Sequence, residues 1–537
     1  MSKFVKYYNT VKYLKKIQIG YRLYYFGRSK YRKLTGFRYP LSAEAKSEDI
    51  KLQESIRSLK SFYKEGKREC FDFLNLSKCF ESKIDWNFSQ YGKLWAYNLN
   101  YFNYLEQTDI NRDDALKLVY DFIEDIENNK EGLEPYPLSL RGINWIKFIV
   151  RNGIKDQKID NSLYAGYLIL MDNLEFHVLG NHILENGLSL LFAAYYFNDR
   201  SFYNSAKEII ERELQEEILK DGAHFELSPM YHQLILFRVL DSLNLVKNND
   251  YFNHELEALL EKRAKEMIEW LNAMTFKNGD IPLFNDSAKF IAPTTKELKG
   301  YAKRLGVESD KKAVLKQSGY RRFDGKRYEM IVDVGNIGPD YIPGHAHSDT
   351  FNFELYIDNK PFIVDTGVST YEDNARRFIE RSTSSHNTVK IGDYEQSEIW
   401  SSFRVAERAK IISLKEDKNR VEAAHDGYKK IGIKHLRKFE SYEDEIIIID
   451  SIEKENKADE FPTAVSYLHF YPGIEVGLEE NSIKTNFAKI LIDGAEKIEI
   501  DDYNYAKGYN NLEKSKVVKI IFRNYCKIKF TFVTNGK

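Results

Sequence analysis

Three short segments of the chain concentrate side chains that can transfer protons or bind anions. The first is GNHILEN at residues 180–186, which contains Asn181, His182 and Glu185. On a helix these positions fall within about one turn, so the three side chains can share a face. An amide, an imidazole and a carboxylate together can bind a substrate carboxylate and fix the tautomer of the imidazole ring. The alternative is a helix start capped by Asn181, with His182 in the core.

The second segment is DGAHFELSPMYH at residues 221–232. Gly222 and Pro229 predict a loop that leads into a helix, and such a junction can present Tyr231 and His232 at a cleft. A phenol has an ordinary pKa near 10, and it exchanges protons in a reaction when a nearby cation stabilises its anion. The chain contains 37 tyrosines, however, so a structural role for Tyr231 stays open.

The third segment is PGHAHSD at residues 343–349. His345 and His347 are two positions apart, so on an extended strand they point the same way. One ring can then bind a metal ion while the other faces a substrate. Asp365 and His386 follow downstream, and with His347 they form a two-imidazole, one-carboxylate set suited to Zn²⁺ or a similar ion. The alternative is three polar residues without a common ligand.

Two kinds of hydrophobic periodicity divide the chain that carries these segments. From about residue 45 to 312 apolar residues return every three to four positions, which predicts paired helices stacked into a solenoid or toroid. The clearest helical patterns lie at residues 43–66, 113–129, 201–219 and 254–276. From about residue 313 to 537 the period is two, which predicts an antiparallel β domain. Within it, Asp358 and Asn359 predict a tight hairpin turn.

The overall composition excludes several classes of protein. The chain has 537 residues, 43% of them hydrophobic, which predicts two or three domains with sizeable cores. No apolar run reaches the ~18 residues of a membrane span, and no secretory signal is recognisable, so we expect a cytoplasmic or membrane-peripheral protein, with noncanonical export as the alternative. Three cysteines predict neither a disulfide framework nor a thiol metal site. Nucleotide-binding and serine-hydrolase motifs are missing, and no nucleic-acid partner is expected.

Residues 1–44 form a basic amphipathic arm. Eleven Lys and Arg residues, from Lys3 to Arg38, precede the first acidic residue, Glu44. Tyr, Leu, Ile and Phe are interleaved with these cations at roughly helical spacing. Such a segment can contact an anionic membrane surface or a polyanionic ligand. The alternative is an arm that packs on its own protein with a solvated charged face.

Taken together, the segments resemble the heparinase II/III-like family of polysaccharide lyases. The matches follow in order: WAYNLNYF (95–102), YPLSLRGINW (136–145), GNHILEN (180–186), DGAHFELSPMYH (221–232), PGHAHSD (343–349), VDTG (364–367) and RSTSSHNTV through EIWSSFRV (381–405). The resemblance implies an incomplete (α/α) toroid followed by an antiparallel β-sandwich, in agreement with the change of period. The first 45 and the last 110 residues carry no matching motif.

The resemblance implies β-elimination on a uronic-acid-containing polysaccharide. In that reaction a base removes the C5 proton, the glycosidic oxygen leaves C4, and a 4,5-unsaturated uronate remains. Asn181, with His182 and Glu185 behind it, would neutralise the uronate carboxylate. Tyr231 would protonate the leaving oxygen and serve as the base for one epimer, and His345 would be the alternative base. The substrate would be glycosaminoglycan-like or a bacterial capsule or exopolysaccharide, and the net charge of −1 favours weak sulfation.

The resemblance also implies a metal site and a substrate groove. His347, Asp365 and His386 would hold a mainly structural divalent ion, most simply Zn, with Ca or Mn as alternatives. Candidate groove residues are Arg141, Asn144, Trp145, Tyr97, Asn98, His232, Tyr371 and Arg404. Two other functions stay open: a catalytically silent glycan-binding or polymer-assembly protein, and a metal-dependent glycan hydrolase. The oligomeric state is not predicted.

Overall fold

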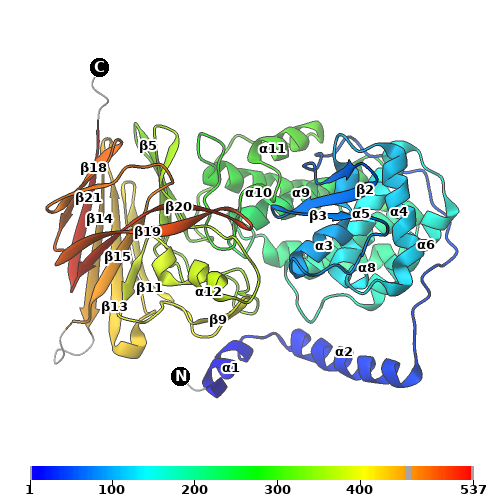
Figure 1. The fold of residues 1–537 in the computed structure, drawn as a ribbon, viewed down its shortest axis with the longest axis horizontal. Helices are drawn as coiled ribbons and strands as arrows, with labels where there is room; N and C mark the ends of the chain where they lie inside the picture. The colour runs from blue at the N-terminus through cyan, green and yellow to red at the C-terminus, as the bar shows by residue number, and fades with distance from the viewer. Residues whose placement is uncertain (1–2, 455–460, 534–537) are drawn as a thin grey trace.

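The computed structural model describes residues 3–454 and 461–533, and these form a helical lobe and a β lobe that lie side by side (Figure 1). The helical lobe ends with α11 (Thr295–Arg304), and the β lobe begins with β4 (Tyr320–Asp324). The predicted order of a helical region followed by a β region is therefore confirmed.

The helical lobe consists of antiparallel helices arranged in two layers. Its helices are α3 (Lys93–Tyr101), α4 (Arg112–Asp125), α5 (Pro135–Asn152), α6 (Gln157–Asp172), α7 (Asn181–Phe197), α8 (Arg200–Glu217), α9 (Pro229–Lys247), α10 (Glu257–Met274) and α11. Helix α7 contacts both α5 and α9, and α6, α8 and α10 pack against α5, α7 and α9 respectively. Since α7 is surrounded on all sides, its sequence is apolar almost throughout, and His182 is its only residue that is not buried.

The β lobe is built from antiparallel sheets that share one hydrophobic core. An eight-stranded sheet has the order β11-β12-β13-β14-β21-β18-β17-β16, and two four-stranded sheets have the orders β19-β20-β15-β8 and β4-β5-β6-β7. Their strands are β4, β5 (Tyr328–Asp333), β6 (Phe353–Ile357), β7 (Lys360–Ile363), β8 (Val389–Ile391), β11 (Ile411–Asp417), β12 (Arg420–His425), β13 (Ile433–Ser441), β14 (Glu445–Lys454), β15 (Ala464–His469), β16 (Gly477–Glu479), β17 (Ser482–Lys484), β18 (Ala488–Asp493), β19 (Lys497–Gly508), β20 (Asn511–Phe522) and β21 (Tyr525–Phe532).

The hairpin predicted at Asp358 and Asn359 joins β6 to β7. Both residues have positive φ angles, 50° and 63°, which a two-residue turn between twisted strands requires. Further along, a strand pair, β9 (Ile399–Ser401) and β10 (Arg404–Val405), and the short helix α12 (Ala375–Arg381) extend from the β lobe toward the helical lobe.

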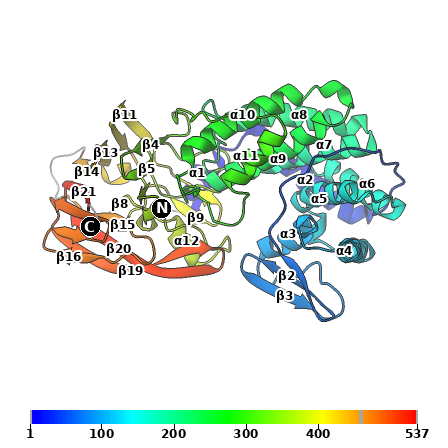
Figure 2. The ribbon, with the colours of Figure 1, turned by 90° about the horizontal axis from the view of Figure 1, so that it is seen from above.

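One helical prediction is wrong. Residues 43–66 run extended and end in β1 (Phe62–Glu65), the first strand of a three-stranded sheet with β2 (Arg68–Phe73) and β3 (Leu76–Phe80). Figure 2 shows this small sheet beside α3. Asparagine side chains of the helical lobe bind the backbone of the extended segment, as in the 2.7 Å bond from the Lys51 amide to Asn249 Oδ1. These tertiary bonds replace the hydrogen bonds that a helix would have made.

The small sheet also contains a disulfide that the sequence did not predict. Cys70 and Cys79 face each other on β2 and β3 and are bonded, whereas Cys526 is free and buried. Among the helices within the described ranges, none has both the length and the apolarity needed to span a bilayer.

Candidate active site

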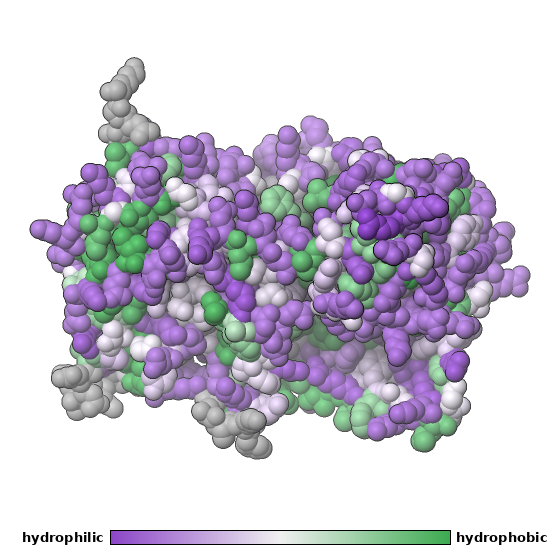
Figure 3. All heavy atoms as spheres, viewed as in Figure 1, coloured by the Kyte–Doolittle hydropathy of each residue, from purple (hydrophilic) through white to green (hydrophobic). Residues whose placement is uncertain are grey.

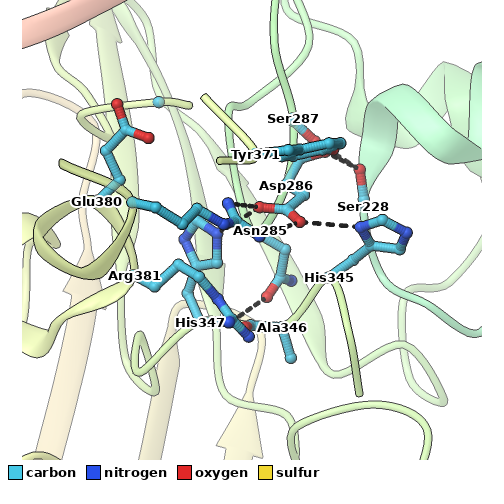
Figure 4. Close-up of polar contacts among 12 residues, drawn as sticks. Ser228, Asn285, Asp286, Ser287, His345, Ala346, His347, Tyr371, Glu380 and Arg381 are labelled. Atoms are coloured by element: carbon cyan, nitrogen blue, oxygen red, sulfur yellow. Dashed lines mark hydrogen bonds and ion pairs between the residues drawn. The ribbon is translucent and has the colours of Figure 1, made fainter. Parts of the chain in front are cut away.

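The candidate site lies between the lobes, where the starts of α7 and α9 meet two loops. One loop connects α10 to α11 and carries Asp286, and the other connects β5 to β6 and carries His345. Tyr371 reaches the same place from the segment between β7 and α12. Figure 4 shows Asp286, His345 and Tyr371 gathered at this junction.

Tyr231 is positioned by the first turn of α9. Pro229 occupies the start of that helix, and the Ser228 hydroxyl accepts a hydrogen bond from the Tyr231 amide at 3.3 Å. The phenol ring lies 4.0 Å from the His345 ring, between centroids, and its hydroxyl is 3.2 Å from that of Tyr371. Burial raises the pKa of Tyr231 well above its ordinary value, although the contact with Tyr371 opposes that rise. The phenol therefore keeps its proton at neutral pH.

His345 is oriented by Asp286. His345 Nδ1 lies 2.8 Å from Asp286 Oδ2. Figure 4 draws this contact as a dashed line. Since the carboxylate can only accept, Nδ1 carries the proton and Nε2 is left as an acceptor. Burial alone would raise the pKa of Asp286, but the charge of Arg377, together with hydrogen bonds from His345, His347 and Arg377, holds that pKa well below its ordinary value. The carboxylate is thus ionised and able to orient the imidazole. An imidazole with a free, correctly aimed nitrogen can act as a general base.

Glu226 lies between Asn181 and His345 and contacts both. Asn181 Nδ2 donates to Glu226 Oε2 at 3.0 Å, and His345 Nε2 lies 3.9 Å from the same oxygen. Both Asn181 and Glu226 are buried, and the Asn181 Oδ1 and Glu226 Oε1 atoms have no protein partner. Gly180 precedes Asn181 with φ +60° and ψ −148°, a conformation that glycine adopts readily. Its missing side chain leaves room for Glu226, whose Oε1 would be 3.2 Å from a β-carbon.

The three polar residues predicted to share a face of α7 bind three different partners. His182 Nδ1 contacts Glu175 Oε1 at 2.9 Å, and Glu185 Oε1 pairs with Arg238 Nε at 3.0 Å inside the helical lobe. Burial would lower the pKa of His182, but Glu175 raises it overall. The three side chains thus lie on one helix start but do not converge on one partner, and their joint role stays a prediction. Glu185 is a buried partner of Arg238, and only Asn181 turns toward His345 through Glu226.

Four predicted groove residues are structural. His232 is fully buried: its Nδ1 accepts a hydrogen bond from the His224 amide and its Nε2 donates to the Met267 carbonyl at 2.9 Å. Arg141, Asn144 and Trp145 lie in the interior of the helical lobe. Arg141 donates to the Gly132 carbonyl at 2.7 Å, and Asn144 to the Tyr101 carbonyl at 2.8 Å. All four side chains are buried, so the structure does not place them in a groove, and the Trp145 indole nitrogen has no hydrogen-bond partner there.

The other predicted groove residues are partly or fully accessible. Tyr371 lines the site directly through its contact with Tyr231. Tyr97 binds Glu134 through its hydroxyl, and the Asn98 amide is bonded to its own helix at Leu94. Arg404 is exposed on the β10 strand, 5.7 Å from the centre of the Trp400 ring. Of these four, only Tyr371 touches the proton-transfer residues.

The predicted metal ligands are neighbours, but their donor atoms do not all lie within 4.8 Å of one another. His386 Nδ1 is 2.8 Å from Asp365 Oδ2, and the rings of His347 and His386 are 5.2 Å apart. The buried nitrogens His347 Nδ1 and His386 Nε2 have no protein partner. These orphaned donors fit a metal ion, since buried polar atoms are rarely left unpaired.

Within the described part of the chain, only one group brings three potential donor atoms within 4.8 Å of one another: Glu65, Cys70 and Cys79. The two cysteines are joined by the disulfide, so they offer no thiolate in this state.

Three residues at or near the site were not predicted as site residues: Glu226, Asp286 and Tyr136. Tyr136 packs against His182 in a tilted arrangement, with ring centres 4.7 Å apart, and it is the first residue of the motif YPLSLRGINW. Glu226 stands inside the motif DGAHFELSPMYH, so its position in the sequence marks it as a candidate site residue. Asp286 lies in no motif that sequence reasoning had selected, because its role depends on contacts between the two lobes.

Comparison with known proteins places the chain in a family. Residues 163–311 match the family model described as "Heparinase II/III N-terminus", and residues 308–527 match "Heparinase II/III-like, C-terminal". The heparin-sulfate lyase of Bacteroides thetaiotaomicron is 24% identical over 236 residues, 36% of this chain and 34% of the relative. That of Pedobacter heparinus is 26% identical over 242 residues, 40% of this chain and 36% of the relative. The matches thus span little more than a third of these relatives.

A crystal structure of heparinase III superimposes with a TM-score of 0.64 at 17% identity, covering 85% of this chain and 80% of that one. At this identity the likeness shows the fold, an α-toroid followed by a β lobe. The two matching models together span residues 163–527, and the chain therefore belongs to the heparinase II/III-like family.

Proposed function

We propose that the chain is a polysaccharide lyase that cleaves a uronic-acid-containing polysaccharide by β-elimination. The observation that supports this most strongly is the meeting of a phenol, an imidazole and an amide at one point between the lobes. The ring of Tyr231 lies 4.0 Å from that of His345, and one Glu226 oxygen lies within 3.9 Å of both His345 Nε2 and Asn181 Nδ2. A single sugar ring can contact all three groups.

The chemical difficulty of β-elimination explains why three groups are needed. The C5 proton stands beside an ionised carboxylate, so its removal builds up negative charge that the enzyme must stabilise. The Asn181 amide has two N–H groups: one donates to Glu226, and the other is left for the uronate carboxylate. Glu226 in this proposal is a positioning residue that sets the direction of the amide.

His345 and Tyr231 then divide the proton transfers. His345 Nε2, the nitrogen not bound to Asp286, takes the C5 proton, and the electron pair of that bond forms the C4–C5 double bond. The bond between C4 and the glycosidic oxygen breaks, and the Tyr231 hydroxyl gives its proton to the leaving oxygen. The raised pKa of Tyr231 suits this division, because the phenol is still protonated when the reaction begins.

The substrate in this proposal is a glycosaminoglycan-like or bacterial surface polymer. The names of the relatives, heparin-sulfate lyases, support an anionic polysaccharide. The net charge of −1 favours a weakly sulfated or unsulfated polymer, since a heavily sulfated one calls for a cationic groove.

The experiment is incubation with a panel of uronic-acid polymers, monitored for the near-ultraviolet absorbance of an unsaturated uronate. Tyr231→Phe should lower the rate by about 10²–10⁴-fold while polymer affinity is retained, because only the proton donor is removed. Tyr195→Phe, which removes the hydroxyl of a buried tyrosine that hydrogen-bonds to Tyr251, is the matched control. New reducing ends without absorbance would indicate a hydrolase, and polymer binding without either product would indicate a binding protein.

A divalent metal ion, most simply Zn²⁺, is part of the same proposal. His347, Asp365 and His386 would hold it, and its chemistry there would be structural, fixing the loop that carries His345. His347→Ala should lower the metal content of the purified protein, measured by elemental analysis. His435→Ala removes another buried histidine, which pairs with Asp450 at 2.8 Å, and should leave the metal content unchanged. An unchanged content in His347→Ala would refute the assignment.

A further inference from the structure

The N-terminal arm lies outside both lobes as α1 (Lys3–Val11) and α2 (Lys16–Thr35), along the lower side of the molecule in Figure 1. Helix α2 contacts the helical lobe through polar side chains. Gln18 donates to the Val178 carbonyl at 3.0 Å, Tyr25 to the Leu174 carbonyl at 2.6 Å, and Arg28 forms an ion pair with Asp172 at 3.0 Å. These residues recur every three to seven positions and therefore mark one face of the helix.

The opposite face of α2 is apolar and points away from the protein. Leu23 is 68% exposed, Phe26 66% and Leu34 87%. A helix on the surface of a soluble protein normally turns its apolar face inward. In α2 the order is reversed, so the polar face docks and the apolar face is left in water. Figure 3 shows apolar side chains along this lower edge of the molecule.

Cations accompany the apolar side chains on the outer side of the arm. Lys16, Lys30 and Lys33 are exposed there, and residues 1–43 contain no acidic residue at all. We define the arm's outer face as Lys16, Ile19, Leu23, Phe26, Lys30, Lys33 and Leu34.

We propose that the arm's outer face binds an anionic lipid surface, and that it holds the protein at a membrane. An amphipathic helix with aliphatic and aromatic residues beside lysines lies in the headgroup region of a bilayer, with the apolar side chains in the acyl boundary and the cations on the anionic headgroups. A polyanionic glycan would satisfy the lysines but would leave Leu23 and Leu34 in water. The aliphatic side chains thus favour lipid, independently of the lyase proposal.

The test is co-sedimentation of the full chain with vesicles of phosphatidylcholine and phosphatidylglycerol in a two-to-one ratio. The protein should pellet with these vesicles, should stay in solution with pure phosphatidylcholine, and should dissociate as salt screens the lysines. Leu23→Ser with Leu34→Ser should weaken binding about a hundredfold, because two leucines no longer enter the bilayer. Reversal of the lysines to glutamate should abolish it.

Control variants show whether lipid binding depends on the arm's outer face or on exposed apolar side chains in general. Leu59 and Val314 are 68% and 71% exposed but lie outside the arm, so Leu59→Ser with Val314→Ser should leave binding unchanged. All the substituted leucines, valine and lysines are exposed, so the melting temperature should not change in any variant. Failure of the wild-type chain to pellet, equal pelleting with pure phosphatidylcholine, or equal loss in the control variant would each overturn the proposal. A dimer that Leu23→Ser with Leu34→Ser dissociates would overturn it in favour of a second copy.

Discussion

The orientation of His345 depends on a single carboxylate from the other lobe. Asp286 binds His345 Nδ1 and His347 Nε2, each at 2.8 Å, and is neutralised by Arg377. The sequence predicted His345 because histidines are few and this one stands in a dense polar segment. It could not single out Asp286 among 81 acidic residues, since nothing in its local sequence distinguishes it. Acidic side chains acquire such roles only through tertiary contacts.

His232 illustrates the opposite error, in which a residue looked functional in sequence and proved structural. Its position next to Tyr231 suggested the cleft, but the helix turns the two side chains in different directions. The ring packs on Trp270, with centroids 4.3 Å apart, and burial lowers the pKa of His232 to about 3.

A pH dependence of stability follows from the buried His232. In the unfolded chain its pKa is about 6.5, so as pH falls below that value the unfolded state takes up a proton that the folded state refuses. As the pH is lowered from 6 to 4, the free energy of unfolding of the wild type, relative to that of His232→Asn, should therefore decrease by about 1.4 kcal/mol for each pH unit. Denaturant unfolding at several pH values measures it. A difference that is constant with pH would show that the ring is protonated in the folded protein.

Two helix starts, those of α7 and α9, place Asn181 and Tyr231 at the site. The sequence predicted the second junction through Pro229, whose fixed φ suits the first helical turn. The first junction needs Gly180, with its positive φ and its contact with Glu226.

Gly180→Ala tests that junction. A β-carbon would strain the backbone and approach Glu226 Oε1 to 3.2 Å, so stability should fall by ~1–3 kcal/mol. The rate on the polymer should fall by about 10²-fold, since Asn181 and Glu226 shift together. Gly279→Ala is the control, because Gly279 also has positive φ, 95°, but has open space around it. It should lose stability without losing rate, and equal rates in both variants would contradict the role of Gly180.

Residues 43–66 show where periodicity alone misleads. Ile50 is buried, and Leu52 and Ile56 pack against the core of the helical lobe at spacings that also suit a helix. The segment is nevertheless extended, because asparagine side chains bind its backbone: Asn161 of α6 binds the Ala45 amide, Asn244 of α9 binds the Gln53 amide, and Asn249 just after α9 binds the Lys51 amide. Such partners are invisible in the sequence, and tertiary bonds override weak local propensity. Helices α8 and α10 were predicted correctly because their apolar pattern is long and regular, so local propensity and tertiary packing favour the same structure.

At the scale of the whole molecule, a hydrophobic cluster joins the two lobes. It contains Trp270, Phe276 and Phe284 from the helical lobe together with Tyr320, Ile331 and Tyr356 from the β lobe. The rings of Phe276 and Tyr356 stack at 3.8 Å between centroids. The change of period predicted the two regions, but no sequence pattern indicated that they share a core.

The shared cluster predicts that the lobes unfold together. The wild type should show one calorimetric transition, and Phe276→Ala should lower the free energy of unfolding by about 3–5 kcal/mol because it leaves a cavity between the lobes. Phe290→Ala removes a phenylalanine that is 73% exposed and should change nothing. Two well-separated transitions in the wild type would mean that the lobes are thermodynamically independent.

The reach of Asp286 from the helical lobe to two histidines of the β lobe also limits how the chain can be divided. A fragment that consists of the β lobe alone keeps His345 and His347 but loses the carboxylate that orients them. A chimera that exchanged either lobe for that of another protein would therefore keep this contact only if the carboxylate and both imidazoles were transferred as a set.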